Sequence, residues 1–332
     1  MNRENTEGNK VVGRFAPSPT GRMHLGNVFT ALMSWLSVRV RGGRWILRIE
    51  DLDPQRSRRD YAEQIEDDLA WLGLDFDEGG LADAGPSAPY SQSARGDIYA
   101  EYLRRLQSTG MTYACTCRRA DLRVASAPHA SDGRVLYTGR CRPQSLPTPF
   151  AAPVEPYAVR LAVPDRDITV ADGVQPAARF NLARECGDFV LRRADGAWAY
   201  QLAVVVDDAL MGATEVVRGA DLMLSAAQQI YLYELLGLTP PAFAHVPLLC
   251  NSAGQRLSKR DSSMAMDELR RHYSPAELTG VLAWIGGLIP TPDPISPADL
   301  AREVPAPLEA LRKRQTIVIP DRILSHSGAK GS

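Results

Sequence analysis

The chain has 332 residues, of which 45% are hydrophobic, and its 38 basic and 39 acidic residues leave a formal net charge of −1. This composition suits two or three globular domains, and it allows a nucleic-acid partner only through a local basic patch. No apolar stretch reaches the ~20 residues of a membrane span, residues 1–10 lack the apolar core of a signal peptide, and five unevenly spaced cysteines favour free thiols, so we expect a cytoplasmic protein with a disordered tail at residues 1–10.

Residues 13–27, GRFAPSPTGRMHLGN, lie between the expected end of a strand at residues 11–12 and an expected amphipathic helix at residues 28–40. The start of a helix offers unpaired N–H groups and a positive dipole end, both of which favour phosphate. Gly26 lets a ligand approach the backbone, and the imidazole of His24 adds a donor for phosphate oxygens. We interpret the segment as a nucleotide site, with a simple Gly/Pro-rich turn as the alternative.

A second strand is predicted at residues 44–51 by its alternation of bulky residues. Because ligands of open parallel sheets bind beyond the carboxyl ends of strands, Glu50 is placed to face the same crevice as His24. The alternative is that the acidic residues here form a solvated turn or cap the next helix. Helices are expected at residues 57–73 and 90–107.

From residue 111 the chain changes character, with Cys115 and Cys117 in one short arm and Tyr137 and Cys141 in another. Three thiols and a phenol could enclose a tetrahedral zinc ion, which would stabilise a loop-rich insert with little core. His129 is a rival fourth ligand, and free buried thiols are the simpler alternative.

After a Pro-rich linker, the sheet-and-helix pattern resumes, which predicts that the insert splits one doubly wound domain into two halves. The expected strands and hairpins lie at residues 157–161, 189–196, 198–206 and 215–221. The expected helices lie at residues 222–236, 266–271, 274–284 and 297–313.

Residues 14–27, together with the Arg-Leu-Ser-Lys-Arg run at residues 256–260, resemble the two signature motifs of class I aminoacyl-tRNA synthetases in their glutamate- and glutamine-specific form. Asn27 stands where the general first motif has a second histidine, a position that commonly varies in the glutamate branch. The two motifs occur in order, ~230 residues apart, which argues against a chance match. The resemblance covers about residues 11–265.

This resemblance implies a Rossmann-like doubly wound parallel sheet split by a zinc-bearing α+β insert, with a short C-terminal helical region. The implied parts are the catalytic halves at residues 11–110 and 188–250, the insert at residues 111–187, and the lysine loop with the helical region at residues 251–325. Catalysis is implied for His24 and Lys259, and nucleotide binding for these two residues with Gly26 and Asn27. Glutamate binding is implied for Arg14, Phe15, Ala16, Pro17, Ser18, Glu50, Tyr200 and Arg218.

These residue types suit glutamate. Arg14 and Arg218 can each bind a carboxylate, Glu50 can bind the ammonium group, and Tyr200 can supply a hydroxyl. Without the resemblance, Tyr200 would be interpreted as a core tyrosine, and Arg218 and Lys259 as exposed charges. The reaction implied by the family is attack of the α-carboxylate on the α-phosphate of Mg²⁺-bound ATP.

A Cys-x-Cys arm followed by Tyr-x-x-x-Cys is similar to the zinc-binding insert of glutamyl-queuosine tRNA(Asp) synthetases, short relatives of glutamyl-tRNA synthetase. This second resemblance implies zinc bound by Cys115, Cys117, Tyr137 and Cys141, and transfer of glutamate to the queuosine base in the anticodon of tRNA(Asp). Only about 70 residues follow Lys259, so no anticodon-binding domain is expected. The RNA-binding candidates on the insert are Arg118, Arg119, Arg140 and Arg142.

Two alternatives stay open at this point. One is a minimal glutamyl-tRNA synthetase that charges a tRNA 3′ end. The other is a non-catalytic RNA- or nucleotide-binding regulator, which the joint presence of the site residues disfavours because a decayed site should have lost some of them.

Overall fold

The structure, a computed structural model, describes residues 10–117, 137–256, 264–320 and 323. Several expected features lie outside the described residues, namely Lys259, His129, Arg118, Arg119 and the first nine residues of the tail expected at residues 1–10. Within the described part of the chain, no helix has the length and apolar character to span a membrane.

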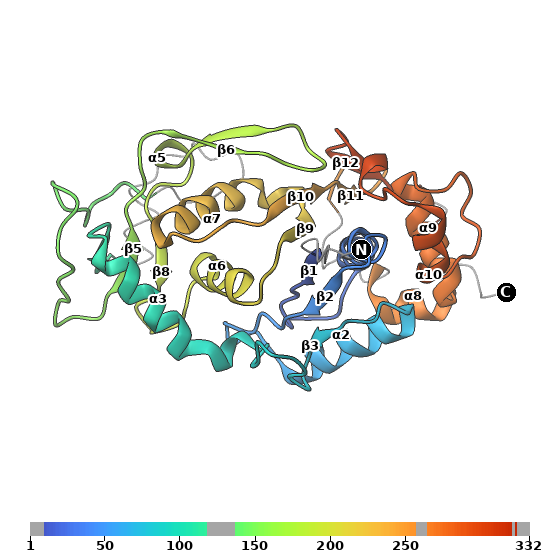
Figure 1. Cartoon of the computed structure of the whole chain (residues 1–332), viewed down its shortest axis with the longest axis horizontal. Helices are drawn as coiled ribbons and strands as arrows, with labels where there is room; N and C mark the ends of the chain where they lie inside the picture. Colours follow the sequence, from blue (N-terminus) through green and yellow to red (C-terminus); the bar gives the residue numbers. More distant parts are fainter. Residues whose placement is uncertain (1–9, 118–136, 257–263, 321–322, 324–332) are drawn as a thin grey trace, which may run out of the picture.

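A five-stranded parallel sheet forms the centre of the molecule (Figure 1). Its strand order is β10 (Ala242–Val246), β9 (Glu215–Gly219), β1 (Val12–Phe15), β2 (Arg44–Leu47) and β3 (Glu78–Gly79). From β1 the early part of the chain builds outward to β2 and β3, and the later part builds to β9 and β10 on the other side. The predicted α/β fold with a parallel sheet is therefore confirmed, and its strand order reverses between β1 and β9, where such sheets bind ligands.

Helix α1 (Leu25–Arg39) packs on the middle of this sheet and is buried along most of its length. It starts one turn earlier than predicted, directly after His24. The predicted helices at residues 57–73, 90–107 and 222–236 are confirmed by α2 (Arg59–Leu72), by the 3-10 helix η1 (Gln92–Arg95) with α3 (Gly96–Ser108), and by α7 (Met223–Leu236).

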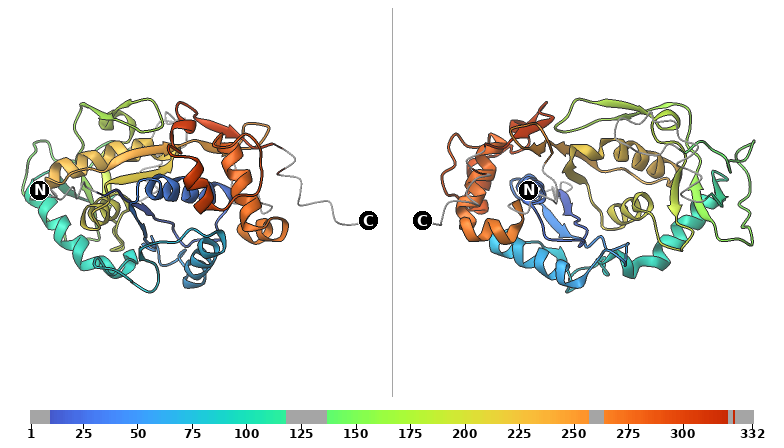
Figure 2. Two further views of the ribbon diagram at one scale, coloured as in Figure 1. Left: turned by 45° about the vertical axis from the view of Figure 1, so that its right-hand side comes forward. Right: turned by 180° about the vertical axis from the view of Figure 1, so that it is seen from behind.

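The insert contains antiparallel strands. β4 (Thr112–Cys115), β5 (Ala158–Leu161) and β8 (Phe189–Arg192) form one sheet, and β6 (Asp167–Val170) and β7 (Ala178–Asn181) form a hairpin followed by the short helix α5 (Leu182–Glu185). The sequence-based division assigned residues 188–192 to the second catalytic half, but β8 pairs with β5. The insert and the C-terminal helices lie at opposite ends of the molecule in all three views (Figures 1 and 2).

The predicted buried strand at residues 198–206 is wrong. These residues enter helix α6 (Tyr200–Leu210), and Leu202 to Val206 are almost completely buried. A short apolar run that is buried on all sides shows no helical period, so its β-branched residues suggested a strand. The correction matters for the site, because Tyr200 is the first residue of a helix.

The C-terminal region was only partly predicted. Strand β11 (Leu248–Cys250) is followed by helices α8 (Met266–His272), α9 (Pro275–Gly286) and α10 (Pro297–Glu303). The helix predicted at residues 297–313 ends at Glu303 because Pro305 and Pro307 follow, and proline lacks the N–H that a helix needs. The chain then forms the 3-10 turn η4 (Glu309–Leu311) and strand β12 (Thr316–Val318), which pairs in parallel with β11.

Candidate active site

A cavity of about 540 Å³ opens where β1, β2, β9 and β10 end at their carboxyl ends. It brings together every expected glutamate- and nucleotide-binding residue that the structure describes. These are Arg14, Phe15, Ala16, Pro17, Ser18, His24, Gly26, Asn27, Glu50, Tyr200 and Arg218.

Two buried groups, Arg48 and Asp208, hold the side chains of Arg14 and Glu50 at one end of this cavity, which we call its inner end. The Arg48 side chain has no exposed surface, and its guanidinium donates to Asp208 at 2.6 Å and to Glu50 at 3.1 Å. Asp208 also accepts from the Nε of Arg14 at 3.3 Å. Arg48 and Asp208 therefore fix Arg14 and Glu50 on the cavity wall.

Sequence analysis did not identify Arg48 or Asp208. Each of them is a charged residue beside an apolar run in the sequence. Because charged side chains are rarely buried unless they are paired, this context could have indicated a buried ion pair. Burial works to raise the pKa of Asp208, but Arg48 and Arg14 outweigh it and the pKa lies below its usual value. For Glu50 burial dominates over the same two arginines, so its pKa is raised.

Arg218, on β9, is 4% exposed, and within the described residues its guanidinium donates to three neutral acceptors. These acceptors are His245 Nε2 at 3.0 Å, Gln229 Oε1 at 2.8 Å and the Leu222 carbonyl at 3.5 Å. Burial lowers its pKa, and within the described chain no carboxylate lies within ion-pair distance of it. The positive charge of Arg218 is thus available to a ligand.

Tyr200 lines the cavity beside these groups, and burial raises its pKa, so its hydroxyl is a neutral donor and acceptor. The guanidinium groups of Arg14 and Arg218 and the carboxylate of Glu50 line this cavity together, and Arg14 also pairs with Asp208. Behind them Arg48 and Asp208 balance each other. Arg14, Arg218 and Glu50 thus present two cations and one anion to the cavity.

The start of α1 forms another wall of the cavity. His24 is the residue before its first turn, and the His24 N–H donates to the Asn27 side-chain oxygen at 3.3 Å. A Cβ on Gly26 would lie 3.3 Å from the His24 ring, so glycine leaves room for a ligand to approach the backbone beside this ring. Because the helix dipole and its free N–H groups favour anions, this wall suits phosphate.

The segment that carries Lys259 begins and ends at the same cavity. Arg256 lines the cavity and pairs with Asp221 at 2.8 Å. On the far side of the segment, Ala265 forms a β-bridge with His24, and the Met266 N–H donates to the Met23 carbonyl at 2.9 Å. Lys259 itself lies outside the described residues.

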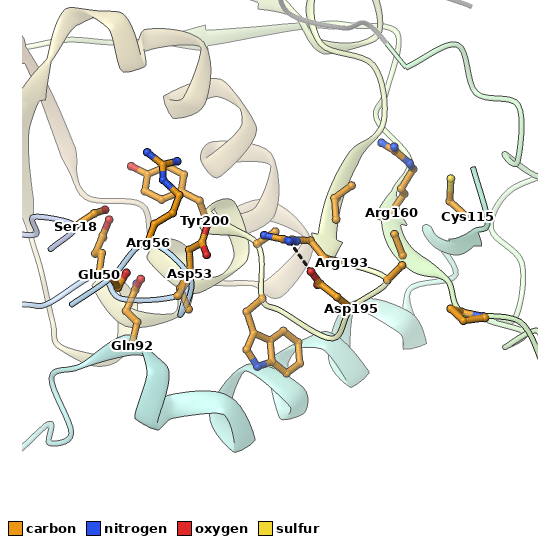
Figure 3. A pocket seen from close by; sticks show the side chains of 18 of the residues that line it. Ser18, Glu50, Asp53, Arg56, Gln92, Cys115, Arg160, Arg193, Asp195 and Tyr200 are labelled. Carbon is orange, nitrogen blue, oxygen red and sulfur yellow. Dashed lines mark hydrogen bonds and ion pairs between the residues drawn. The ribbon is translucent and has the colours of Figure 1, made fainter. Parts of the chain in front are cut away.

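A second, larger cavity of about 1100 Å³ shares Ser18, Thr20, Glu50 and Tyr200 with the first. It extends from these residues to the insert, and in Figure 3 Ser18 and Glu50 lie at one end, with Arg160 and Cys115 at the other. Its walls include Asp53, Arg56, Glu155, Arg193, Asp195 and Trp198. The two cavities therefore join the inner site to the cysteine arms.

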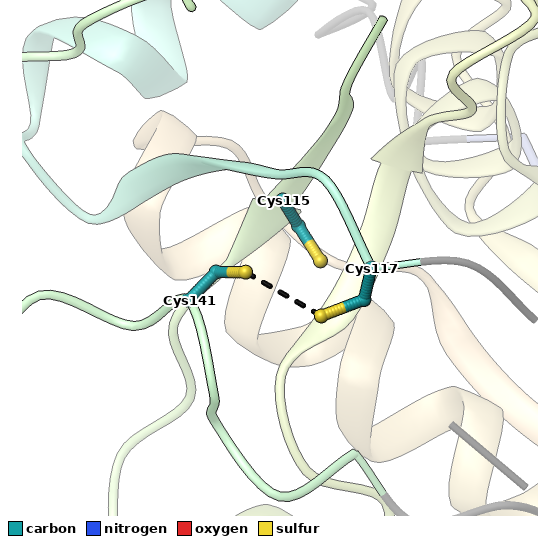
Figure 4. Close-up of side chains that lie close together, drawn as sticks. All are labelled: Cys115, Cys117 and Cys141. Carbon is teal, nitrogen blue, oxygen red and sulfur yellow. Dashed lines mark hydrogen bonds between the residues drawn. The ribbon is translucent and has the colours of Figure 1, made fainter. Parts of the chain in front are cut away.

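The thiols of Cys115, Cys117 and Cys141 converge, and their sulfur atoms all lie within 4.8 Å of one another (Figure 4). The Tyr137 hydroxyl lies 3.6 Å from Cys115 Sγ and accepts the Cys141 N–H at 2.8 Å. Burial opposes ionisation of Cys141, but the Thr116 amide and the neighbouring thiols lower its pKa to about 7. In a tetrahedral zinc site the sulfurs would be about 3.8 Å apart, so the donor set fits such an ion.

Of the expected RNA-binding arginines, the structure describes Arg140 and Arg142. Arg140 is exposed. Arg142 instead pairs with Asp188 at 3.0 Å and donates to the Val163 carbonyl, so it helps to hold the insert together.

Comparison with known proteins agrees with this geometry. The family described as class I tRNA synthetases (E and Q), catalytic domain, matches residues 10–286. The chain belongs to this family of glutamate- and glutamine-specific class I tRNA synthetases.

Its curated relatives include proteins named Glutamyl-Q tRNA(Asp) synthetase. The one from Symbiobacterium thermophilum is 48% identical over 87% of this chain and 91% of its own length. The one from Nitratidesulfovibrio vulgaris is 47% identical over 87% of this chain and 90% of its own length. Among solved structures, the glutamate-tRNA synthetase from Elizabethkingia anophelis matches with a TM-score of 0.80 at 31% identity, over 95% of this chain and 69% of that one.

Proposed function

We propose that the protein activates L-glutamate with ATP as glutamyl-adenylate and transfers the glutamyl group to the queuosine base in the anticodon of tRNA(Asp). The observation that carries the first half is Arg218, a buried cation with neutral partners, which shares a cavity with Arg14, Glu50 and the start of α1. Transfer to tRNA(Asp) is supported by the names of the relatives, whose own length is matched to about nine tenths.

The charge of the inner cavity supports glutamate as the substrate. Glutamate carries two carboxylates and one ammonium group, which complements two guanidinium groups and one carboxylate. Glutamine would leave one buried guanidinium without a counter-ion, and an unpaired buried charge is costly. Arg14 and Arg218 bind the carboxylates in this proposal, Glu50 binds the ammonium group and Tyr200 supplies a hydroxyl.

Activation follows when the α-carboxylate oxygen attacks the α-phosphorus of ATP and pyrophosphate leaves. Negative charge builds up on the phosphoryl oxygens in this step, so the N–H groups at the start of α1, His24 and Lys259 are the proposed stabilising groups. Gly26 and Asn27 border the nucleotide. ATP brings Mg²⁺, which neutralises phosphate charge.

Transfer requires a second substrate to reach the adenylate, and the larger cavity offers that approach. A hydroxyl of the queuosine ring attacks the adenylate carbonyl, AMP leaves and an ester forms. The alternative acceptor is a tRNA 3′ end, and the structural similarity to a glutamate-tRNA synthetase supports this alternative. Arg140 is the described arginine of the insert that remains a candidate for RNA contact.

We also propose that Cys115, Cys117, Tyr137 and Cys141 bind zinc, which would supply a structural cross-link between the two arms of the insert. The convergence of the three thiols and the Tyr137 hydroxyl supports this set. His129, the rival ligand, lies outside the described residues.

The test of activation is pyrophosphate exchange into ATP. We expect exchange with glutamate and without tRNA, and a rate with glutamine lower by ~10² or more, because glutamine leaves a buried guanidinium unpaired. His24→Ala and Lys259→Ala should each lower the rate by ~10²–10³ if these groups act in the transition state.

His272→Ala is the matched control for this assay, since it removes an imidazole that does not line the cavity. It should leave the exchange rate unchanged. Exchange that survives both the His24 and the Lys259 substitutions would remove the proposed roles, and equal exchange with glutamine would contradict the substrate.

Metal analysis tests the zinc site. Purified protein should hold about one zinc ion per chain, and Cys141→Ala should release it, because three donors hold zinc less firmly than four. Cys250→Ala is the matched control, since Cys250 is buried in β11 and lies outside the thiol cluster. Tyr137→Phe should weaken zinc binding and His129→Ala should not; the reverse result would replace the tyrosine by the histidine.

A further inference from the structure

We propose that His245 and Asp172 are positioning residues for Arg218, and that through it they set the affinity for the amino-acid substrate. The inference rests on the proposed role of Arg218 in binding glutamate. Neither residue lines the cavity, and sequence analysis gave no reason to select them. What connects them to the site is a continuous line of contacts: Arg218 Nε donates to His245 Nε2 at 3.0 Å, and His245 Nδ1 lies 2.5 Å from Asp172 Oδ2.

The hydrogen bonds fix where the imidazole carries its proton. An arginine Nε always carries hydrogen, so His245 Nε2 must accept from Arg218 and cannot be protonated. The ring proton therefore sits on Nδ1 and is donated to Asp172. Burial lowers the pKa of His245 although Asp172 acts in the opposite direction, which agrees with a neutral ring.

Asp172 is held rigidly for this task. Its side chain has no exposed surface, and its Oδ1 accepts the N–H groups of Val174 at 2.9 Å, Gln175 at 2.8 Å and His245 at 3.1 Å. The Gly173 N–H donates to the Phe243 carbonyl on β10 at 2.8 Å. A loop between β6 and β7 is thus fastened to the strand that carries His245.

Arg218 is held from its other side as well. Its Nη1 donates to Gln229 Oε1 at 2.8 Å, and Gln229 Nε2 donates to Gln201 Oε1 at 2.9 Å. Because His245 and Gln229 both offer neutral acceptors, the guanidinium is oriented without losing its charge to a local carboxylate. A carboxylate of the substrate can then form the charge-assisted pair.

Asp172→Asn isolates this role. The asparagine oxygen can keep the three backbone contacts of Oδ1, so the change is confined to the atom that faces His245. An amide NH₂ there would require Nδ1 to accept, the proton would move to Nε2, and Nε2–H would face the N–H of Arg218. We expect the KM for glutamate to rise by about tenfold and the KM for ATP to stay close to wild type, while the unfolding temperature falls because two buried N–H groups then face each other.

The sign of this effect separates positioning from simple electrostatics. Removing a negative charge behind Arg218 would by itself favour an anionic substrate and lower the KM for glutamate. Asp165→Asn is the matched control, because Asp165 is an exposed carboxylate of the insert that pairs with Arg184. In the double variant Asp172→Asn/His245→Gln, the amide oxygen of glutamine can accept from Arg218, so most of the loss should be recovered.

Nitrogen-15 NMR of the histidine rings gives a readout that does not depend on activity. The wild-type His245 signal, assigned by its disappearance in His245→Gln, should show a proton on Nδ1, and in Asp172→Asn the proton should be on Nε2. An unchanged tautomer, or an unchanged KM for glutamate in an active enzyme, would overturn the inference. If the wild-type protein shows no glutamate-dependent exchange, the proposed function fails instead, and the tautomer result still decides whether the contact line exists.

Discussion

Arg218→Ala is expected to lower kcat/KM for glutamate in pyrophosphate exchange by about 10³, because a buried charge-assisted pair with the substrate is lost. The protein should still fold. Arg218 donates to His245, Gln229 and a backbone carbonyl, all neutral, so its removal breaks no direct ion pair among the described residues. The KM for glutamate should rise, whereas the KM for ATP should change little.

Two further variants sharpen this prediction. Arg218→Lys keeps the charge but not the planar fork, so it should retain activity between the wild type and the alanine variant. Arg105→Ala is the matched control, since it removes an exposed arginine on α3 that pairs with Glu101. A similar rise in the KM for ATP and for glutamate in Arg218→Ala would contradict the assignment of Arg218 to the amino acid.

The residues that could be placed in the site without the family resemblance are those with a local signature, whereas Tyr200 and Arg218 were placed there by the resemblance alone. The turn before α1 is built from Pro, Gly and a helix start, and its chemistry can be interpreted before the fold is known. Glu50 could be placed because a strand end in a parallel sheet points to the ligand crevice. The thiols could be grouped because Cys115 and Cys117 share an arm, although only the fold brings Cys141 to them.

The residues that were missed act through contacts between distant parts of the chain. Arg48 and Asp208 are 160 positions apart and meet only because the fold brings the residue after β2 to helix α6. Asp172 reaches His245 across 73 positions, from a loop of the insert. No periodicity marks such pairs, and their only trace in the sequence is a charge beside apolar neighbours.

Helix α6 shows a second limit. Its run of Ala203 to Val206 has the residue types of a strand, and the prediction failed because burial on all sides hides the helical period. Tertiary packing, in which α6 lies against α3 and α7, overrides the weak β preference of valine.

Removing queuosine from the acceptor tRNA is the other change with a large expected effect, because transfer of glutamate should depend completely on this modified base. A glutamyl ester on queuosine does not involve the 3′ end, so periodate oxidation of that end before the reaction should not prevent labelling. Queuosine-free tRNA(Asp) lacks the hydroxyl that attacks the adenylate, and it should accept no glutamate. In tRNA(Glu) the 3′ end is the acceptor of the alternative function, so this RNA separates the two.

The most direct measurement is therefore transfer of labelled glutamate, in the presence of ATP, to tRNA(Asp) and tRNA(Glu) prepared with and without queuosine and with intact or oxidised 3′ ends. We predict alkali-labile label only on queuosine-containing tRNA(Asp), whether its 3′ end is intact or oxidised. Label on tRNA(Glu) that disappears after oxidation of the 3′ end would contradict the queuosine acceptor and establish charging of the 3′ end in its place.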